Sequence, residues 1–374
     1  MAVAFAAAAV ANSSCPSVLA FSHPPSCRSA LAPTGGSAPA SRSSSSISIS
    51  RAHSALLSTS VAATSADDVP SPTKPSDVSD AKDTSISGTN SEGGDRKSRK
   101  RQQRKELIRS EGGPLAFDTK YGALNPYAIY YGLTSIALGL VWFVALSMAQ
   151  LFYFVTRGKL DTKRRLPVFL SHIWGTCLLR LTRNFPRMEN RDILLDFYKQ
   201  NKAAMFVGNH NSWMDIPLIG ATIGWRNYKF VAKKELEKVP ILGKAIMSAK
   251  NVCVDRSNRR SQIQTLKAGM NWLKEGVHLT TFPEGTRSRS GKLMKFQGGA
   301  FKMAHKMKAP VVPLSIVASG KIMPAHWLFP LRPGRNICKV VVHDPIESED
   351  KTEEELAQAV REAIISGLPE DQRP

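Results

Sequence analysis

The sequence predicts an α/β fold preceded by at least one membrane-associated helix. From about Arg187 onward, short apolar runs rich in β-branched residues alternate with stretches of helical periodicity. Between Lys120 and Arg157 there is no charged residue, and that interval is long enough for a helix that crosses a bilayer. The residues before this interval have the composition of targeting and linker segments, so the folded part is shorter than the 374-residue chain.

The first 66 residues have the composition of an organelle transit peptide. From Met1 to Ala66 there is no Asp or Glu, and the segment is dense in Ser and Ala with scattered arginines. Its length and Ser content favour a chloroplast over a mitochondrial address. A secretory signal is disfavoured because AFAAAAVA follows no basic region. The alternative is a disordered tail without a targeting role.

Residues 67–113 stay polar and close on the basic run DRKSRKRQQRK, Asp95 to Lys105. This composition supplies no core, so we interpret the segment as a disordered linker or a solvated arm. The whole chain carries a net charge of +21 with a pI near 9.9. Such a charge implies an anionic partner, which can be nucleic acid, an acidic membrane surface or a phosphorylated substrate.

Residues 126–182 are expected to form the membrane-anchoring part of the chain. Leu133 to Phe154 has about the length of a bilayer-spanning helix. A weaker apolar segment, Leu166 to Leu181, contains His172 and Arg180 and is too short and too polar to span by itself. It can instead lie half-inserted or at the interface, in which case the first segment need not cross fully.

Residues 187–374 are expected to form one α/β domain of roughly 190 residues. One clear helix has its apolar stripe at Ile263, Leu266, Met270 and Leu273 and ends before Gly276. Another begins with a capping box at Thr352 and Glu355 and stops at Gly367. The expected strands are Ala203 to Val207, Tyr228 to Val231, Val252 to Val254, Val277 to Phe282, Val311 to Val317 and Cys338 to Val342.

The stretch GNHNSWMDIP places His210 and Asp215 five positions apart. On a continuous helix that spacing separates two side chains by about 140°, so one helix face cannot hold both in contact. The pair can meet if His210 lies in a turn after a strand and a helix begins near Ser212, with Asp215 in its first turn. Alternatively, Asp215 only caps this helix and His210 is structural. Ser212 lacks the glycine-flanked elbow of a nucleophile, so we interpret it as a helix cap.

A second motif, FPEGTRS from Phe282 to Ser288, follows the apolar run VHLTT. Its Pro and Gly predict a turn that exposes backbone N–H groups, and Arg287 can bind a phosphate bidentately. Lys292 and Lys295 add positive charge nearby. A solvated basic loop is the alternative, but a tight turn at the end of a buried strand favours an anionic ligand.

Together the two motifs resemble those of the glycerolipid acyltransferase family. Asn209 to Asp215 is similar to that family's NHxxxxD block, and Phe282 to Ser288 to its FPEGTRS block. Val254-Asp-Arg256 resembles the family's second block and Val311-Val-Pro313-Leu its fourth, in the same order. The resemblance implies a single acyltransferase domain with a central mixed sheet flanked by helices.

The resemblance also implies a reaction and its residues. The family transfers an acyl group from a thioester to a glycerol hydroxyl, and the transit-like N-terminus favours the plastid members that acylate the sn-2 hydroxyl of 1-acylglycerol 3-phosphate to phosphatidic acid. His210 would be the general base and Asp215 its orienting partner, without an acyl-enzyme. The phosphate pocket of the acceptor would comprise Glu284, Gly285, Thr286, Arg287 and Arg256. No metal site and no cofactor are expected.

The expected partners follow from this reaction. The donor would be an acyl carrier protein thioester or acyl-CoA, the acceptor lysophosphatidic acid, and the surroundings membrane lipid, in the chloroplast and specifically its inner envelope membrane. Within the same class, the acceptor can instead be glycerol 3-phosphate or another lysophospholipid. Outside it, the chain can be a membrane-anchored basic module that binds nucleic acid through Asp95 to Lys105; with the acyltransferase motifs present, no nucleic acid is expected.

Overall fold

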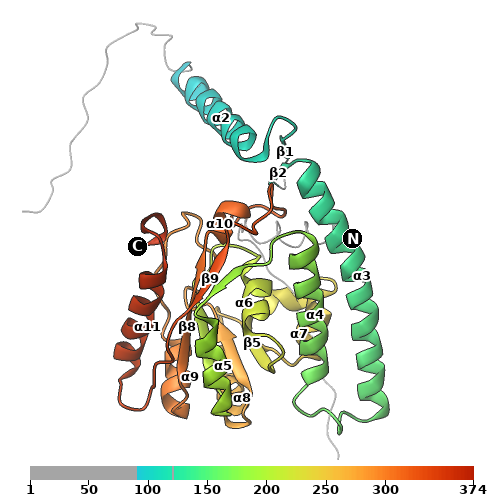
Figure 1. The fold of residues 1–374 in the computed structure, drawn as a ribbon, viewed down its shortest axis with the longest axis vertical. Helices are drawn as coiled ribbons and strands as arrows, with labels where there is room; N and C mark the ends of the chain where they lie inside the picture. The colour runs from blue at the N-terminus through green and yellow to red at the C-terminus, as the bar shows by residue number, and fades with distance from the viewer. Residues whose placement is uncertain (1–90, 120–121) are drawn as a thin grey trace, which may run out of the picture. The chain divides into compact units, whose positions relative to one another are not determined.

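The computed structural model describes residues 91–119 and 122–374 (Figure 1). The expected transit segment, residues 1–66, lies outside the described residues, and so does the first half of the expected linker. In the second half the structure differs from the expectation of disorder, because α2 (Ser91–Gly112) is helical. Arg, Lys, Gln and Glu are strong helix formers, so a stretch too polar to build a core still has a helical backbone. Near its end, Ile108 is buried against Trp327 and Leu331.

A seven-stranded mixed sheet forms the centre of the α/β domain, as the family resemblance implied. Its order is β3-β9-β8-β4-β7-β5-β6, and a separate small antiparallel pair, β1 with β2, precedes it. The strands β4 to β8 are all parallel to one another where they pair, whereas β9 runs antiparallel to β8 and parallel to β3. The strands are β1 (Phe117–Thr119), β2 (Gly122–Leu124), β3 (Arg187–Glu189), β4 (Met205–Gly208), β5 (Tyr228–Lys233), β6 (Val252–Val254), β7 (His278–Thr281), β8 (Val311–Val317) and β9 (Lys339–Val342).

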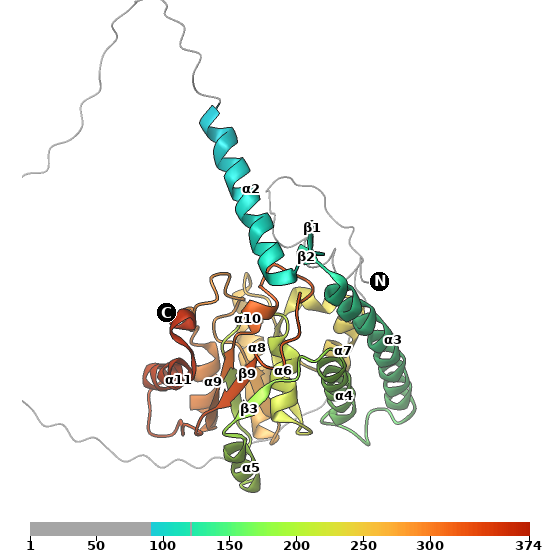
Figure 2. The same cartoon turned by 45° about the horizontal axis from the view of Figure 1, so that its top comes forward.

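Helices cover both faces of this sheet (Figures 1 and 2). Side chains alternate along β4, so Phe206 packs in one core with α4, α5 and α6, while Met205 and Val207 pack in the other with α8, α9 and α11. The helices are α3 (Pro126–Val155), α4 (Arg165–Leu181), α5 (Arg191–Lys199), α6 (Asp215–Ile223), α7 (Leu242–Ser248), α8 (Arg259–Lys274), α9 (Gly299–Met307), α10 (Ser319–Ile322) and α11 (Glu353–Gly367), with 3₁₀ turns at η1 (Lys234–Lys238) and η2 (Glu370–Gln372).

Helix α3 contains the expected membrane segment, and among the described residues it is the helix long and apolar enough to cross a bilayer. It begins at Pro126 because the side chain of Asn125 accepts a hydrogen bond from the N–H of Ala128 (2.8 Å) and proline suits the first helical position. Much of its apolar surface is exposed. The exposed large side chains are Ile129, Tyr130, Leu133, Leu140, Val141, Phe143, Val144, Met148, Leu151, Phe152, Phe154 and Val155.

The opposite side of α3 packs on α4 and α7, beside which it runs in both views (Figures 1 and 2). Trp142 of α3 stacks on Trp174 of α4 with ring centroids 4.3 Å apart. Lys244 of α7 donates a hydrogen bond to the hydroxyl of Ser147 (2.7 Å). Helix α4 in turn packs on α6, where His172 contacts the carbonyl of Gly220 (3.1 Å). This second segment therefore joins α3 to the core of the domain.

Candidate active site

His210 and Asp215 meet at the end of β4. The Nδ1 atom of His210 lies 2.8 Å from Oδ2 of Asp215, although the two residues are five positions apart. Contact is possible because His210 lies in the loop after β4 and Asp215 is the first residue of α6. The expected arrangement of loop histidine and first-turn aspartate is present, but the helix begins three residues later than Ser212.

The Asp215 carboxylate is fixed in place by the loop that it closes. Its Oδ2 atom also accepts hydrogen bonds from the backbone N–H groups of Asn211 (2.7 Å) and Ser212 (2.8 Å). The side chain is fully buried, and its Oδ1 atom has no partner among the described residues. The hydroxyl of Ser212 accepts a hydrogen bond from the N–H of Met214 (3.1 Å), so Ser212 shapes the turn before the helix. The helix cap itself is Met214, so the prediction that Ser212 caps the helix was wrong.

The His210 ring lies between the two sequence motifs. It stacks on Phe282, with ring centroids 4.0 Å apart and planes at 11°, and its side chain is 14% exposed. The carbonyl of His210 accepts a hydrogen bond from the N–H of Ser288 (2.8 Å). The motifs converge because β4 and β7 are parallel neighbours, whose carboxyl ends lie at one edge of the sheet.

Glu284 is buried, and its carboxylate binds backbone N–H groups instead of facing solvent. Its Oε1 atom accepts a hydrogen bond from the backbone N–H of His210 (2.6 Å), and its Oε2 atom from the N–H of Met294 (3.0 Å). Burial raises the pKa of this carboxyl to about 7, and the two backbone hydrogen bonds oppose that rise. A buried acid with both oxygens occupied does not suit the phosphate contact that the resemblance implied for Glu284.

Gly285 and Arg256 lie against each other at the turn after β7. Gly285 has a positive φ of 77°, which glycine adopts without steric cost. A Cβ atom added there would lie 2.9 Å from Nη1 of Arg256. The Val254-Asp-Arg256 block thus reaches the FPEGTRS turn, where Thr286 is exposed.

Arg287 is held by two contacts that leave part of its guanidinium available. Its Nη1 atom donates to the carbonyl of Ala325 (2.6 Å), and its Cζ atom lies 4.2 Å from the centroid of the Trp213 ring. One N–H of five is used in this way. The side chain is therefore preorganised and can still bind an anion.

Asn209 is a site residue whose role the sequence did not reveal. Its side chain donates to the carbonyl of Ile316 (2.9 Å) and accepts from the N–H of the same residue (2.7 Å). These two hydrogen bonds join the residue after β4 to β8 and so fix the start of the loop that carries His210. Pro313, which belongs to the fourth block, is buried within β8 and pairs with Val207 of β4.

Other histidines make internal hydrogen bonds. His278 accepts from the N–H of Ala204 (3.1 Å), and burial lowers its pKa to about 4. His343 contacts the hydroxyl of Ser315 (2.7 Å), which donates to the carbonyl of Ile364 (2.7 Å). These contacts tie strands to neighbouring elements, which agrees with a structural role. Within residues 91–119 and 122–374, no group of His, Cys, Asp and Glu side chains is arranged to hold a metal ion.

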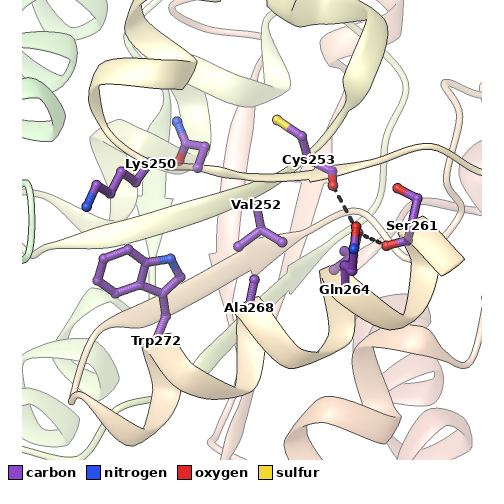
Figure 3. A pocket seen from close by; sticks show the side chains of 9 residues that line it. Lys250, Val252, Cys253, Ser261, Gln264, Ala268 and Trp272 are labelled. Carbon is purple, nitrogen blue, oxygen red and sulfur yellow. Dashed lines mark hydrogen bonds between the residues drawn. The ribbon is translucent and has the colours of Figure 1, made fainter. Parts of the chain in front are cut away.

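A separate hollow of about 180 Å³ lies between β6 and α8 (Figure 3). It is lined by residues that include Lys250, Val252 and Trp272. At its other end the hydroxyl of Thr265 donates to the carbonyls of Cys253 and Ser261, both at 2.9 Å. Neither His210 nor Asp215 lines it, so it is not part of the candidate site.

The comparisons of this chain with known proteins agree with one another, because each finds similarity to acyltransferases. Residues 184–317 match the family model described as Acyltransferase. The 1-acyl-sn-glycerol-3-phosphate acyltransferase of Chlamydomonas reinhardtii is 35% identical over 45% of this chain and 49% of its own length. The chloroplastic enzymes LPAT1 of Arabidopsis thaliana and BAT2 of Brassica napus are 33% and 38% identical, each over 49% of this chain and over 49% and 51% of their own lengths. The chain thus spans about half the length of these curated relatives.

The fold also matches a solved structure. The crystal structure of the 1-acyl-sn-glycerophosphate acyltransferase PlsC from Thermotoga maritima has a TM-score of 0.50 to this chain and is 25% identical. The match covers 64% of this chain and 95% of the Thermotoga protein. It therefore reaches beyond the residues matched by the family model. Residues 184–317 are thus similar to the acyltransferase family, and the fold is similar to that of PlsC.

Proposed function

We propose that the chain transfers an acyl group from a thioester to the sn-2 hydroxyl of 1-acylglycerol 3-phosphate and so forms phosphatidic acid. The observation that carries the proposal is the 2.8 Å contact between His210 and a fully buried Asp215 at the sheet edge. The relatives from Chlamydomonas, Arabidopsis and Brassica are named 1-acyl-sn-glycerol-3-phosphate acyltransferases, which supports this choice of acceptor.

His210 would act as the general base. An ionised Asp215 accepts a hydrogen bond from Nδ1–H, and this fixes the tautomer in which Nε2 carries a lone pair. Nε2 has no hydrogen-bond partner among the described residues, so it can accept the proton of the substrate hydroxyl. A hydroxyl is a weak nucleophile near neutral pH, so removal of this proton during attack speeds the reaction.

The hydroxyl oxygen would attack the thioester carbonyl carbon directly. As the C–O bond forms and the C–S bond breaks, the imidazolium of His210 returns the proton to the departing thiolate. Asp215 stabilises the imidazolium during this interval. Because the substrate supplies the nucleophile, no acyl-enzyme forms, and Ser212 is not required as a nucleophile.

The phosphate of the acceptor would bind at the turn after β7. Gly285, Thr286, Arg287 and Arg256 supply the pocket, since the positive φ of Gly285 keeps the turn tight and the two arginines supply charge. In place of the direct contact implied by the resemblance, we assign Glu284 to positioning, because its carboxylate binds the backbone of His210.

Helix α3 would hold this site at a membrane surface. Its exposed apolar side chains leave a wide face without protein contacts, and a lysophospholipid acceptor resides in the bilayer. The chloroplastic relatives support a plastid membrane, and we propose the inner envelope. In that compartment an acyl carrier protein thioester is the proposed donor, with acyl-CoA as the alternative.

The test is an acyl-transfer assay on the purified chain. Lysophosphatidate and glycerol 3-phosphate are offered in turn with acyl carrier protein and CoA thioesters. The proposal predicts phosphatidic acid from lysophosphatidate, and the same activity after deletion of residues 1–113. Transfer to glycerol 3-phosphate alone would overturn the assignment of the acceptor, and absence of transfer with every pair would overturn the reaction.

A further inference from the structure

A basic pocket lies away from the candidate active site, at the loop that follows α4. Its volume is about 410 Å³, and four of its lining side chains are arginines. The lining residues are Arg180, Arg183, Phe185, Pro186, Arg187, Arg335 and Asn336. None of the residues assigned above to acyl transfer or to the acceptor phosphate lines it.

The charges in this pocket are largely uncompensated. Among the described residues, Arg187 has one acidic neighbour, Glu189, at 3.8 Å, and that carboxylate makes a shorter contact of 3.0 Å with Lys339. Arg180, Arg183 and Arg335 make no ion pair with any described residue. Clustered guanidinium groups repel one another unless an anion lies between them, so this arrangement favours an anionic ligand.

Two distant segments build the pocket rigidly. The N–H of Arg335 donates to the carbonyl of Arg183 (2.9 Å), and the N–H of Gly334 donates to the buried side chain of Asn184 (2.8 Å). Asn184 also donates to the hydroxyl of Tyr127 at the start of α3 (2.8 Å). The arginine backbones are therefore held before any ligand binds, which lowers the entropic cost of binding.

The pocket lies at the same edge of the sheet as His210. In the sheet, Lys339 pairs with Val317 at the end of β8 and with Arg187 at the start of β3. Three strand spacings separate β4 from β3, about 14 Å at the usual spacing. A ligand in this pocket is thus near the candidate site without occupying it.

An exposed apolar surface reaches the rim of the pocket. Leu181, between two pocket arginines, is 55% exposed, and its carbonyl accepts a hydrogen bond from the hydroxyl of Tyr130 (2.8 Å). Tyr130 is itself exposed and begins the apolar face of α3. Tyrosines at one end of an apolar helix mark the depth at which lipid headgroups lie.

We infer that this pocket binds the phosphate headgroup of an anionic membrane phospholipid, separate from the acceptor that the enzyme acylates. The acyl chains of that lipid lie along the exposed apolar face of α3 and α4, and its phosphate is held by Arg180, Arg183 and Arg335. Such a lipid would fix the sheet edge that carries His210 against the membrane surface. Phe185 and Pro186 add uncharged lining to the pocket.

Calorimetric titration of the full chain in neutral detergent tests this site without any acyl-transfer reaction. The probes are a short-chain phosphatidylglycerol, a short-chain phosphatidylcholine and inorganic phosphate. The site variant is R180Q/R183Q/R335Q, and the charge-matched control is R101Q/K105Q/R109Q on the exposed surface of α2. A third variant, R287A, removes a cation from the proposed acceptor pocket.

Phosphatidylglycerol is expected to bind the wild type, the α2 control and R287A alike, and to bind the site variant at least tenfold more weakly. Phosphatidylcholine and inorganic phosphate are expected to bind the wild type weakly. Undiminished phosphatidylglycerol binding by the site variant, or loss in R287A instead, would overturn the assignment. Inorganic phosphate that binds as tightly as the lipid would mean a free-phosphate site, which also contradicts the proposal.

Two further measurements complete the test. R180K/R183K/R335K keeps the charge but loses the planar guanidinium fork, so it is expected to bind with intermediate affinity even if the glutamine variant does not fold. An acidic acyl carrier protein, titrated without lipid, is expected to bind the site variant and the wild type equally. If the carrier protein lost its binding to the site variant, the pocket would be a protein-docking site and the lipid assignment would be wrong.

Discussion

The carboxylate of Glu284 accepts a hydrogen bond from the backbone N–H of His210, with 2.6 Å between Oε1 and N. The acid of the FPEGTRS motif therefore fixes the backbone of the histidine in the NHxxxxD motif. Asp215 fixes the imidazole of the same residue through Nδ1. Two carboxylates thus determine where the proposed base lies, one through its backbone and one through its ring.

Replacing Glu284 with Gln is expected to lower kcat by about tenfold to a hundredfold, with little change in the KM for lysophosphatidate. An amide has one acceptor oxygen, so one of the two backbone N–H groups that Glu284 now satisfies would face an NH₂ group. Small displacements of a catalytic group can cost about a hundredfold in rate. Steady-state kinetics check this, with Glu189→Gln on β3 as the control that keeps wild-type kcat. A change confined to the acceptor KM would instead support a direct phosphate contact.

Gly285→Ala is expected to raise the acceptor KM severalfold and to lower the free energy of unfolding by about 1 kcal/mol. The positive φ of 77° disfavours any Cβ, and the added atom would lie 2.9 Å from the Arg256 guanidinium. Gly298→Ala is the matched control, because a Cβ there meets no atom within 4 Å. Equal acceptor KM values for the two variants would argue against a phosphate pocket at this turn.

Arg287→Ala is expected to raise the KM for the phosphorylated acceptor by about tenfold to a hundredfold, and that for the acyl donor much less. A hydrogen bond to a charged group contributes about 1.5–3 kcal/mol, and the guanidinium is already oriented by Trp213 and the Ala325 carbonyl. Arg289→Ala removes an exposed charge two residues away and serves as the control. A change in the donor KM alone would move Arg287 out of the acceptor pocket.

Lys229 is expected to make stability rise with pH between about 7 and 10.5. It is fully buried, and its ammonium donates to the carbonyls of Lys163 (2.9 Å) and Arg164 (3.2 Å) in the α3–α4 loop. Burial lowers its pKa from 10.5 to about 7. In this window the folded chain has released the proton and the unfolded chain still binds it, so the free energy of unfolding increases with pH.

Denaturant unfolding at a series of pH values from 6 to 10 measures this dependence. Lys229→Met removes the titrating group, so the rise contributed by this residue, at most about 1.4 kcal/mol per pH unit, should disappear. Lys306→Met, at an exposed position on α9, should leave it unchanged. An identical slope for wild type and Lys229→Met would show that Lys229 does not titrate in this window.

The sequence predicted most strands of the sheet well because the central strands are buried on both faces and form apolar runs. Val252–Val254 and Val311–Val317 have the expected bounds, and the other expected strands differ by one or two residues at their ends. Strand β3, Arg187–Glu189, was missed because its sequence RME carries no apolar run. It forms because it pairs with β9 at the sheet edge, which is a tertiary effect.

Site residues were easier to predict than their orientations. The spacing of His210 and Asp215 excluded a shared helix face and favoured a loop and a first turn, which is the arrangement that the structure has. For Glu284, sequence and resemblance placed the residue at the site but could not show which way its carboxylate points. That direction depends on how the loop after β7 packs against the loop after β4. There the backbone N–H groups of His210 and Met294 both need an acceptor, and the Glu284 carboxylate supplies it.

The most direct test of the account is the rate of acyl transfer to lysophosphatidate by folded His210→Ala and Asp215→Asn variants, with the fold checked by circular dichroism. If His210 is the general base, His210→Ala should lose activity to background. Asp215→Asn should lose about 10⁴-fold in kcat, as for the corresponding carboxylate of a catalytic triad, because the imidazole loses its orienting partner. Wild-type transfer by folded His210→Ala would contradict the mechanism.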